Sequence, residues 1–469
     1  MSDLSQYHAE IAKKRVAFHP QGLKKIPALN KALKGHQEAS VVFALETGSS
    51  ATFMGTGLGK TFVELEFARV IAEATNRPVL MAAPLACALQ HQREAERWGI
   101  DARAIREAGE VDGARVYITN FDRLDRFNPA DFPGVVLDES SILKNFSGVT
   151  SRKLISDFSQ TPYRLAGTAT PAPNDYTELG QHSAFVGAMP SSEMLSRWFI
   201  TDQTMMGRYR LKHPAVKPFF DWMASWSRAL TKPSDLGFSD DGYILPALIE
   251  ERMPLRADVT IDPGQDKNGQ GRLFRMPEVS ATSIHREKRL TVEQRADAVA
   301  ARVLQEPGEY WVLWCDTDYE ADALMARLPE AVEVRGSQSI AEKERKLEAF
   351  ARGEIKWLIT KPKIAGWGPN WQHCARMALA GMSFSYEAYH QIVRRCWRFG
   401  QARDVVVFIP CVDTEQVAWT AVNRKASDHD VMQREMIAAM QRAVQVHRTL
   451  EAYAPPTPAN LPAFLQRAA

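Results

Sequence analysis

The sequence predicts an α/β protein with two parallel sheets in series, each flanked by helices, and a helical and loop insertion between them. Three observations predict this class. Apolar strand-like runs alternate with amphipathic segments twice, first over residues 49–172 and again from Gly308. A glycine-rich turn at residues 54–61 lies between a strand-like run and a helical run. A further run, Val135–Leu137, ends in two carboxylates.

The first alternation contains five strand-like runs. Several of them are continuously apolar, as expected for parallel strands that are covered on both faces. The predicted strands are Ala51–Met54, Val79–Ala83, Arg115–Thr119, Gly134–Leu137 and Tyr163–Ala166.

The second alternation has the same form. Helical segments are predicted between its strands, for example Tyr319–Leu328 and Ile340–Arg352. The predicted strands are Tyr310–Cys315, Val332–Val334, Lys356–Thr360, Ala375–Ala380 and Val405–Pro410.

The segment Gln181–Arg286 interrupts this rhythm and is interpreted as an insertion followed by a linker. Its stretch Tyr209–Trp226 mixes aromatic and basic residues. Two interpretations remain open for that stretch: aromatic rings that stack on nucleic acid, or aromatic rings that pack as a small helical core, which we favour.

Composition sets wide bounds on the function. The chain has 469 residues and a net charge of +2. This charge neither requires nor excludes a nucleic-acid partner, because acidic residues elsewhere on the surface can balance the positive charge of a basic cleft. No apolar run approaches the ~20 residues of a membrane span. The five cysteines lack CxxC spacing, so we expect reduced thiols in a cytoplasmic protein rather than a disulfide framework or a zinc site.

The glycine-rich turn reads Met-Gly-Thr-Gly-Leu-Gly-Lys-Thr over residues 54–61. Backbone N–H groups in such a turn can cradle phosphates, Lys60 would reach the β- and γ-phosphates, and the Thr61 hydroxyl would ligate Mg²⁺. Met54 stands where the strict pattern has glycine, and an ordinary strand-to-helix turn is the alternative interpretation. The amphipathic run Thr61–Ala72 places the turn at a helix N-terminus, which favours phosphate binding.

The two carboxylates are Asp138 and Glu139. An acid at the end of a buried strand holds Mg²⁺, and a neighbouring carboxylate orients the attacking water. Together with the glycine-rich turn, they predict nucleotide hydrolysis.

Three more segments extend this pattern: Leu165–Pro171, Gly366–Asn370 and Gln391–Gln401. In the last of these, Arg395 and Arg398 are three residues apart and share a helix face. Two guanidinium groups on the second domain would stabilise charge on a nucleotide held between the domains. An arginine pair on a solvated helix is the alternative interpretation.

With these motifs the chain resembles a superfamily 2 helicase-type motor of the DEAD/DEAH class, and within it the Swi/Snf-like branch of double-stranded DNA translocases. The residues that carry the resemblance are Asp138–Asn145, the set Gln391, Arg395, Arg398 and Gly400-Gln401, and His36-Gln37 upstream of the glycine-rich turn. The resemblance implies two tandem RecA-like domains at 33–180 and 291–445, with an N-terminal arm at 1–32, an insertion and linker at 181–290 and a proline-containing tail at 446–469.

The resemblance also implies roles for single residues. Asp138 would ligate Mg²⁺ together with Thr61, Glu139 would be the catalytic base, and Arg395 and Arg398 would be arginine fingers. The residues that would bind ATP are Gln37, Gly55, Gly57, Gly59, Lys60, Thr61, Gly368 and Gln391.

Two further sets follow from the resemblance. Gly167, Thr168 and Thr170 would couple hydrolysis to movement. The residues expected at a nucleic-acid backbone are Pro84, Leu85, Thr119, Asn120, Lys144 and Asn145, each with a strand-end turn or loop cap as the alternative. Ser141 stands where many relatives have a histidine that bridges to the coupling motif, which puts the efficiency of coupling in question.

The sequence therefore predicts an ATP- and Mg²⁺-dependent motor that moves on DNA, with duplex DNA favoured, in the cytoplasm of a bacterium or of a phage-infected cell. A partner protein could dock on the 181–290 insertion. A strand-separating DNA or RNA helicase is the alternative within this class. A nucleic-acid-binding scaffold with a degenerate ATPase is the alternative from another class.

Overall fold

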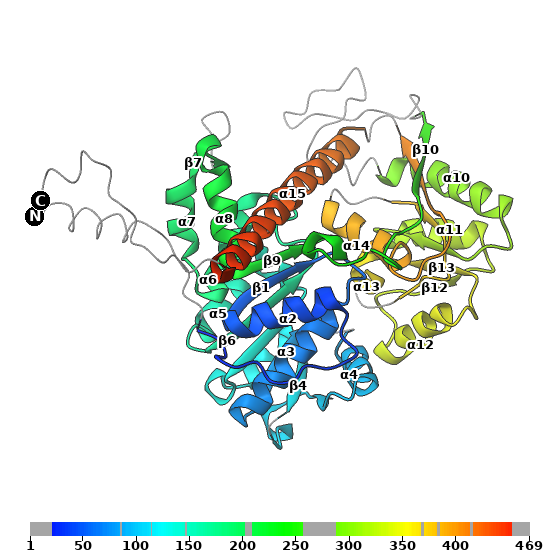
Figure 1. Ribbon diagram of the computed structural model, residues 1–469. Helices are drawn as coiled ribbons and strands as arrows, with labels where there is room; N and C mark the ends of the chain where they lie inside the picture. Colours follow the sequence, from blue (N-terminus) through cyan, green and yellow to red (C-terminus); the bar gives the residue numbers. More distant parts are fainter. Residues whose placement is uncertain are drawn as a thin grey trace, which may run out of the picture.

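The computed structural model describes residues 21–84, 87–113, 115–145, 148–201, 209–256, 288–366, 370–381, 385–412 and 416–452. Within these ranges the protein is a mixed α/β structure with two parallel sheets flanked by helices, consistent with two RecA-like domains (Figure 1). The fold class predicted from the sequence is confirmed. Most of the arm at 1–32 and most of the tail at 446–469 lie outside the described residues.

The first sheet has seven parallel strands in the order β3-β4-β2-β5-β6-β1-β9. Its strands are β1 Ser49–Met54, β2 Val79–Ala83, β3 Ala102–Ala104, β4 Val116–Asn120, β5 Gly134–Asp138, β6 Tyr163–Thr168 and β9 Ser227–Leu230. The five strands predicted here are present, and β3 and β9 are additional.

The second sheet has six parallel strands in the order β10-β15-β14-β11-β13-β12. Its strands are β10 Leu248–Leu255, β11 Trp311–Trp314, β12 Val332–Glu333, β13 Trp357–Thr360, β14 Arg376–Leu379 and β15 Val405–Val412. The five strands predicted for this half are present, and β10 joins them from the segment that the sequence assigned to the insertion. A separate antiparallel pair is formed by β7 Phe199–Thr201 and β8 Tyr209–Leu211.

Helices cover both faces of each sheet (Figure 1). Those of the first half are α2 Gly35–Thr47, α3 Lys60–Thr75, α4 Ala88–Arg97, α5 Val149–Asp157, α6 Leu179–Val186, α7 Ser191–Trp198 and α8 Val216–Trp226. Those of the second half are α10 Val292–Gln305, α11 Asp318–Arg327, α12 Ile340–Ala351, α13 Pro362–Ala365, α14 Tyr386–Cys396 and α15 Gln416–Ala452. Short 3₁₀ turns are η1 Ala108–Glu110, η2 Phe121–Arg126, η3 Pro129–Asp131, η4 Ser140–Lys144, η5 Tyr176–Glu178, η6 His213–Ala215 and η7 Pro233–Leu236.

The alternation of side chains along each strand divides the core into two layers. In β5, Val135 and Leu137 face the layer under α6, α7 and α8, whereas Val136 faces the layer under α2 and α3. All three side chains are fully buried. This explains why the strands read as continuous apolar runs.

The aromatic residues of α8 belong to the core. Phe219, Phe220, Trp222 and Trp226 are buried beneath the first sheet, and Trp222 and Trp226 pack edge to face. The structure therefore favours the packed helical core over the stacking surface for this part of the aromatic stretch.

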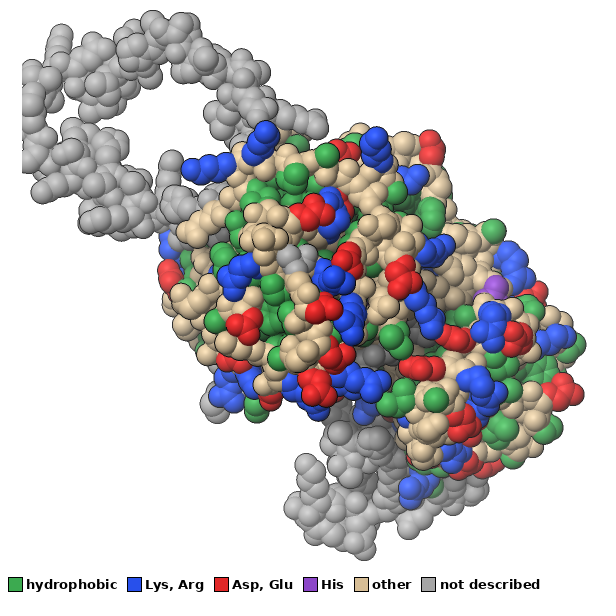
Figure 2. Space-filling view, turned by 90° about the horizontal axis from the view of Figure 1, so that it is seen from below, with side chains coloured by type: hydrophobic (Ala, Val, Ile, Leu, Met, Phe, Trp, Pro, Cys, Tyr) green, Lys and Arg blue, Asp and Glu red, His purple; other side chains and the backbone are tan. Residues whose placement is uncertain are grey.

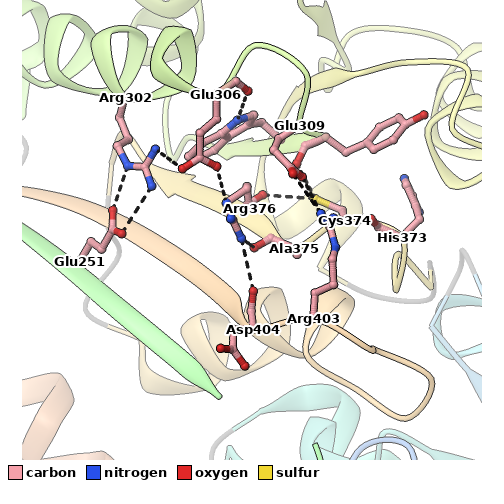
Figure 3. A network of polar contacts seen from close by, with 12 residues as sticks. Glu251, Arg302, Glu306, Glu309, His373, Cys374, Ala375, Arg376, Arg403 and Asp404 are labelled. Atoms are coloured by element: carbon pink, nitrogen blue, oxygen red, sulfur yellow. Dashed lines mark hydrogen bonds and ion pairs between the residues drawn. The ribbon is translucent and has the colours of Figure 1, made fainter. Parts of the chain in front are cut away.

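A network of ion pairs holds the edge of the second sheet. Arg302 on α10 bonds Glu251 of β10 at 2.9 Å and Glu306 at 2.8 Å, and Glu306 accepts a bond of 2.6 Å from Arg376 of β14 (Figure 3). These contacts attach β10 to α10 and β14, which follow much later in the chain.

The long helix α15 leaves the second sheet and packs on the first half (Figure 1). Its side chains Met432, Met436 and Ala439 are buried in the layer beneath α8. Arg442 also bonds Asp221 of α8 at 2.6 Å. The helix therefore joins the two halves through an apolar face and an ion pair.

We predict that Met436→Ala lowers the free energy of unfolding by about 2–5 kcal/mol, because it removes a buried side chain and leaves a cavity. Val431 on the same helix is 41% exposed, so Val431→Ala is the matched control and should change stability by less than about 0.5 kcal/mol. Urea unfolding followed by circular dichroism measures both. Equal losses in the two variants would contradict the docked arrangement of α15.

Candidate functional site

A cleft of about 260 Å³ lies between the two halves. Its walls come from the ends of β1 and β5, the start of α3, the helix α4 and the region of α14. The lining residues include Gly55, Gly57, Gly59, Lys60, Thr61, Asp138, Glu139, Arg395 and Arg398, all of which the sequence proposed, together with Cys87, His91, Asn370 and Phe399, among others. Gly368 and Leu85 lie outside the described residues.

The glycine-rich turn has a backbone that favours glycine. Gly57 and Gly59 have φ values of +91° and +85°, a region that other residues seldom adopt. A Cβ on Gly57 would lie 2.9 Å from the backbone nitrogen of Phe399, and a Cβ on Gly59 would lie 2.1 Å from Nε2 of Gln37. Gly59 is also the N-cap of α3, so the turn presents backbone N–H groups at the positive end of a helix.

Gln37 lies against this turn without lining the cleft. Its Nε2 donates to the carbonyl of Leu58 at 2.9 Å, and its Oε1 accepts from the backbone N–H of Lys34 at 2.9 Å. His36 Nε2 lies 3.0 Å from the same Leu58 carbonyl. In this structure, Gln37 therefore fixes the shape of the turn.

Lys60 lies among three carboxylates. Its Nζ bonds Oδ1 of Asp138, and it lies 3.4 Å from Oε1 of Glu64 and 3.9 Å from Oε1 of Glu139. Burial alone would lower the pKa of Lys60, but the charges of Asp138, Glu139 and Glu64 outweigh burial and raise this pKa well above its usual value. Lys60 therefore carries a full positive charge at the end of the sheet.

Glu64 was missed by the sequence analysis. It is fully buried one helical turn after Lys60, and burial followed by the charge of Asp138 raises its pKa well above the ordinary range. A Cβ on Gly167 would lie 1.7 Å from Glu64 Oε1, so Gly167 leaves room for this carboxyl group. The i, i+4 spacing to Lys60 was the available signal, because it places both side chains on one helix face.

Asp138 has two basic neighbours. Lys60 contacts one of its oxygens, and His91 Nε2 lies 2.6 Å from the other. Burial would raise the pKa of Asp138, but the charges of Lys60 and His91 hold this pKa well below its usual range. Local sequence could not identify His91, because its contact with Asp138 depends on the pairing of β2 with β5, which brings α4 to the end of β5.

Glu139 has an unusual backbone, with φ of +57° in a non-glycine residue. Its Oε2 accepts a hydrogen bond of 3.3 Å from Thr168, whose Oγ1 in turn accepts from the backbone N–H of Thr170 at 3.2 Å. Burial raises the pKa of Glu139. Of the predicted coupling residues, Thr168 thus contacts the acidic motif directly, and Thr170 contacts Thr168.

His182 was also missed. It is fully buried on α6, and its Nε2 lies 3.1 Å from the hydroxyl of Ser140, the residue after Glu139. A histidine from a different element therefore supports the acidic segment. His182 lies 42 residues after Ser140, so no local sequence pattern indicated this contact.

The two arginines belong to the last turn of α14 and the residues after it. Arg395 is 7% exposed, and burial lowers its pKa while the nearby Glu139 raises it. Arg398 bonds the side chain of Asn370, and burial lowers its pKa to about 10. Gln391 is not among the lining residues; its backbone carbonyl accepts from Arg395 Nε at 3.1 Å.

The residues expected to contact nucleic acid differ in burial and in position. Thr119 and Asn120 are buried at the end of β4, Pro84 follows β2, and Asn145 is exposed. Lys144 forms an ion pair with Glu387 at the start of α14, across the two halves. Basic and acidic side chains are interspersed over the face seen in Figure 2.

Residues 294–400 match the family model for the helicase conserved C-terminal domain. This helicase domain covers α10 to α14 and ends just after the two arginines. The match supports a superfamily 2 helicase-type protein, a class of ATP-hydrolysing nucleic-acid motors. No curated protein matches the chain.

Among the described residues, no helix has the length and apolar character to span a membrane.

We predict that Gly59→Ala weakens nucleotide binding about tenfold or more. The left-handed backbone costs an alanine about 1–2 kcal/mol, and the added methyl displaces Gln37 from the Leu58 carbonyl. Gly109→Ala is the control, because nothing lies within 4 Å of its Cβ position. Titration with a fluorescent ATP analogue measures both variants, and unchanged affinity in Gly59→Ala would count against this geometry.

We predict that stability falls below pH 6.5 through His182. Burial lowers its pKa to about 4, so the unfolded chain takes up a proton between pH 6.5 and 4 that the folded state excludes. The free energy of unfolding therefore falls as pH drops through this window, by roughly 3 kcal/mol in total. Urea unfolding at several pH values should give a shallower slope for His182→Gln, and an unchanged slope for the exposed control His213→Gln.

Proposed function

We propose that the chain is an ATP-dependent nucleic-acid motor, and specifically a translocase on double-stranded DNA. One observation supports this most strongly. Lys60, Asp138 and Glu139 from the first half line the same cleft as Arg395 and Arg398 from the helicase domain. A nucleotide held there contacts both halves, so its hydrolysis changes how the two halves meet.

The residues present fit ATP and Mg²⁺. The glycine-rich turn at the start of α3 offers backbone N–H groups where a Cβ would collide, which suits a phosphate chain. Asp138 stays ionised because Lys60 and His91 hold its pKa low, so with Thr61 it suits a divalent cation. When bound, Mg²⁺ neutralises charge on the phosphates. Lys60 is positioned to exchange its carboxylate partners for phosphate oxygens.

Glu139 suits the role of catalytic base. Its raised pKa makes it a better proton acceptor than an ordinary carboxylate, and the Thr168 hydroxyl orients it. Thr168 also accepts from the backbone of Thr170, which connects the base to the segment Gly167–Thr170. We infer that this chain of bonds transmits the state of the cleft to the neighbouring loop.

The preference for duplex DNA and the Swi/Snf-like assignment rest on the sequence of Asp138–Asn145 and of the arginine motif. Contacts to phosphates through residues such as Lys144 would make binding independent of sequence and sensitive to salt. The division into domains at 33–180 and 291–445, and the docking of a partner on 181–290, belong to the same proposal.

We predict that ATP hydrolysis is stimulated most by double-stranded DNA. The assay compares no nucleic acid, duplex DNA, single-stranded DNA and RNA. Glu139→Gln should lower the rate about a hundredfold or more, because it removes the base, whereas Glu344→Gln on the exposed face of α12 should retain it.

Each outcome separates the alternatives. Stimulation by single strands or RNA alone would favour a strand-separating helicase. Hydrolysis that persists in Glu139→Gln would remove this residue from the mechanism. A protein that binds nucleic acid and hydrolyses no ATP under any condition would be a scaffold with a degenerate ATPase.

A further inference from the structure

Cys87 and His91 form a two-residue clip at the start of α4. Cys87 has helical backbone angles, φ −97° and ψ −21°, and its carbonyl accepts a bond of 2.9 Å from the backbone N–H of His91. The two residues are therefore one helical turn apart on one face. Residues with this i, i+4 spacing on a helix are a frequent pair of metal ligands.

Asp138 completes a cluster with this clip. The strand β2 leads into α4 and pairs with β5, which ends at Asp138. One ligand atom from each of Cys87, His91 and Asp138 lies within 4.8 Å of the other two, and all three residues are buried. Within the described part of the chain, Nδ1 of His91 has no hydrogen-bond partner. The cluster therefore holds a thiol, an imidazole and a carboxylate at the floor of the cleft.

These three donor types are the ones that zinc prefers. Zn²⁺ binds thiolate sulfur, imidazole nitrogen and carboxylate oxygen, and sites with three protein ligands leave a fourth position open. Mg²⁺ instead takes oxygen ligands and keeps several waters. Because all three residues line the nucleotide cleft, the fourth position faces the space proposed for ATP.

We propose that Cys87, His91 and Asp138 bind one soft divalent ion of the zinc class, and that this ion inhibits the nucleotide site. The inhibition rests on the proposed function, whereas the binding of the ion does not. Donor atoms around a tetrahedral zinc ion lie about 3.3–3.8 Å apart, so the cluster closes on the ion with movements of about 1 Å. Asp138 then leaves Lys60, its present partner.

The thiol explains why the site discriminates between ions. Metal binding releases the thiol proton, because the ligand is the thiolate. A soft ion gains a strong bond to sulfur in return, whereas Mg²⁺ gains little from it. The two ions therefore compete for Asp138 while using different additional ligands.

Cobalt(II) provides a direct test with the full-length protein and no nucleotide. We expect one Co²⁺ per chain, with a thiolate-to-cobalt charge-transfer band and intense tetrahedral d–d bands, which equimolar Zn²⁺ removes. Cys87→Ser should abolish the charge-transfer band, and His91→Ala should weaken Co²⁺ binding at least tenfold. Cys411→Ser, at a half-buried cysteine in β15, is the matched control and should keep the full spectrum.

Absence of a charge-transfer band, or a band that survives in Cys87→Ser, would overturn the site. Far-ultraviolet circular dichroism establishes that each variant is folded, and Cys87→Ala provides a second test if the serine variant is not. A separate measurement addresses inhibition: micromolar Zn²⁺ should lower ATP hydrolysis, and excess Mg²⁺-ATP should relieve it. A positive cobalt spectrum with no ATP hydrolysis would retain the metal site and reject the proposed function.

Discussion

The charged cluster around Lys60 is the constraint on which the rest of the site depends. Glu64, Asp138 and Glu139 meet a single ammonium group at the end of a buried sheet, and burial raises the pKa of both glutamates. Buried charge of one sign is costly unless it is compensated. Arg395 supplies a second positive charge close to Glu139 and comes from the other half of the molecule. The electrostatic balance of the first half is therefore completed by the second, which gives a physical reason for the two halves to meet at this cleft.

Much of the fold and part of the site follow from local sequence. The ten predicted strands are present because buried parallel strands read as continuous apolar runs. Lys60, Asp138 and Arg395, which local sequence patterns singled out, line one cleft. Of the strands in the two large sheets, β3, β9 and β10 were missed. β3 spans three residues, and the other two lie in a segment that breaks the alternation; β10 shows only partial burial along its length. His91, Glu64 and His182 were missed because their roles arise from packing between elements distant in the chain.

The conformation of Glu139 is a second feature that local sequence does not reveal. A left-handed backbone at a residue with a full side chain costs about 1–3 kcal/mol, and it persists because the surroundings hold it. Ser140 contacts His182, while the Glu139 carboxylate accepts from Thr168. The strain is thus balanced by two contacts from different elements, α6 and β6. Such a residue responds to small movements of either element, which fits the catalytic role that we propose for Glu139.

The path of the chain between the halves has a mechanical consequence. It passes from the first sheet to the second between Leu230 and Leu248, and α15 returns from the second sheet to pack on α8. A rigid body attached at two separate points loses most of its freedom to translate and keeps chiefly rotation about the line that joins them. The second half is therefore attached to the first at two separate points, so rotation about the line that joins these points is its main remaining movement relative to the first half.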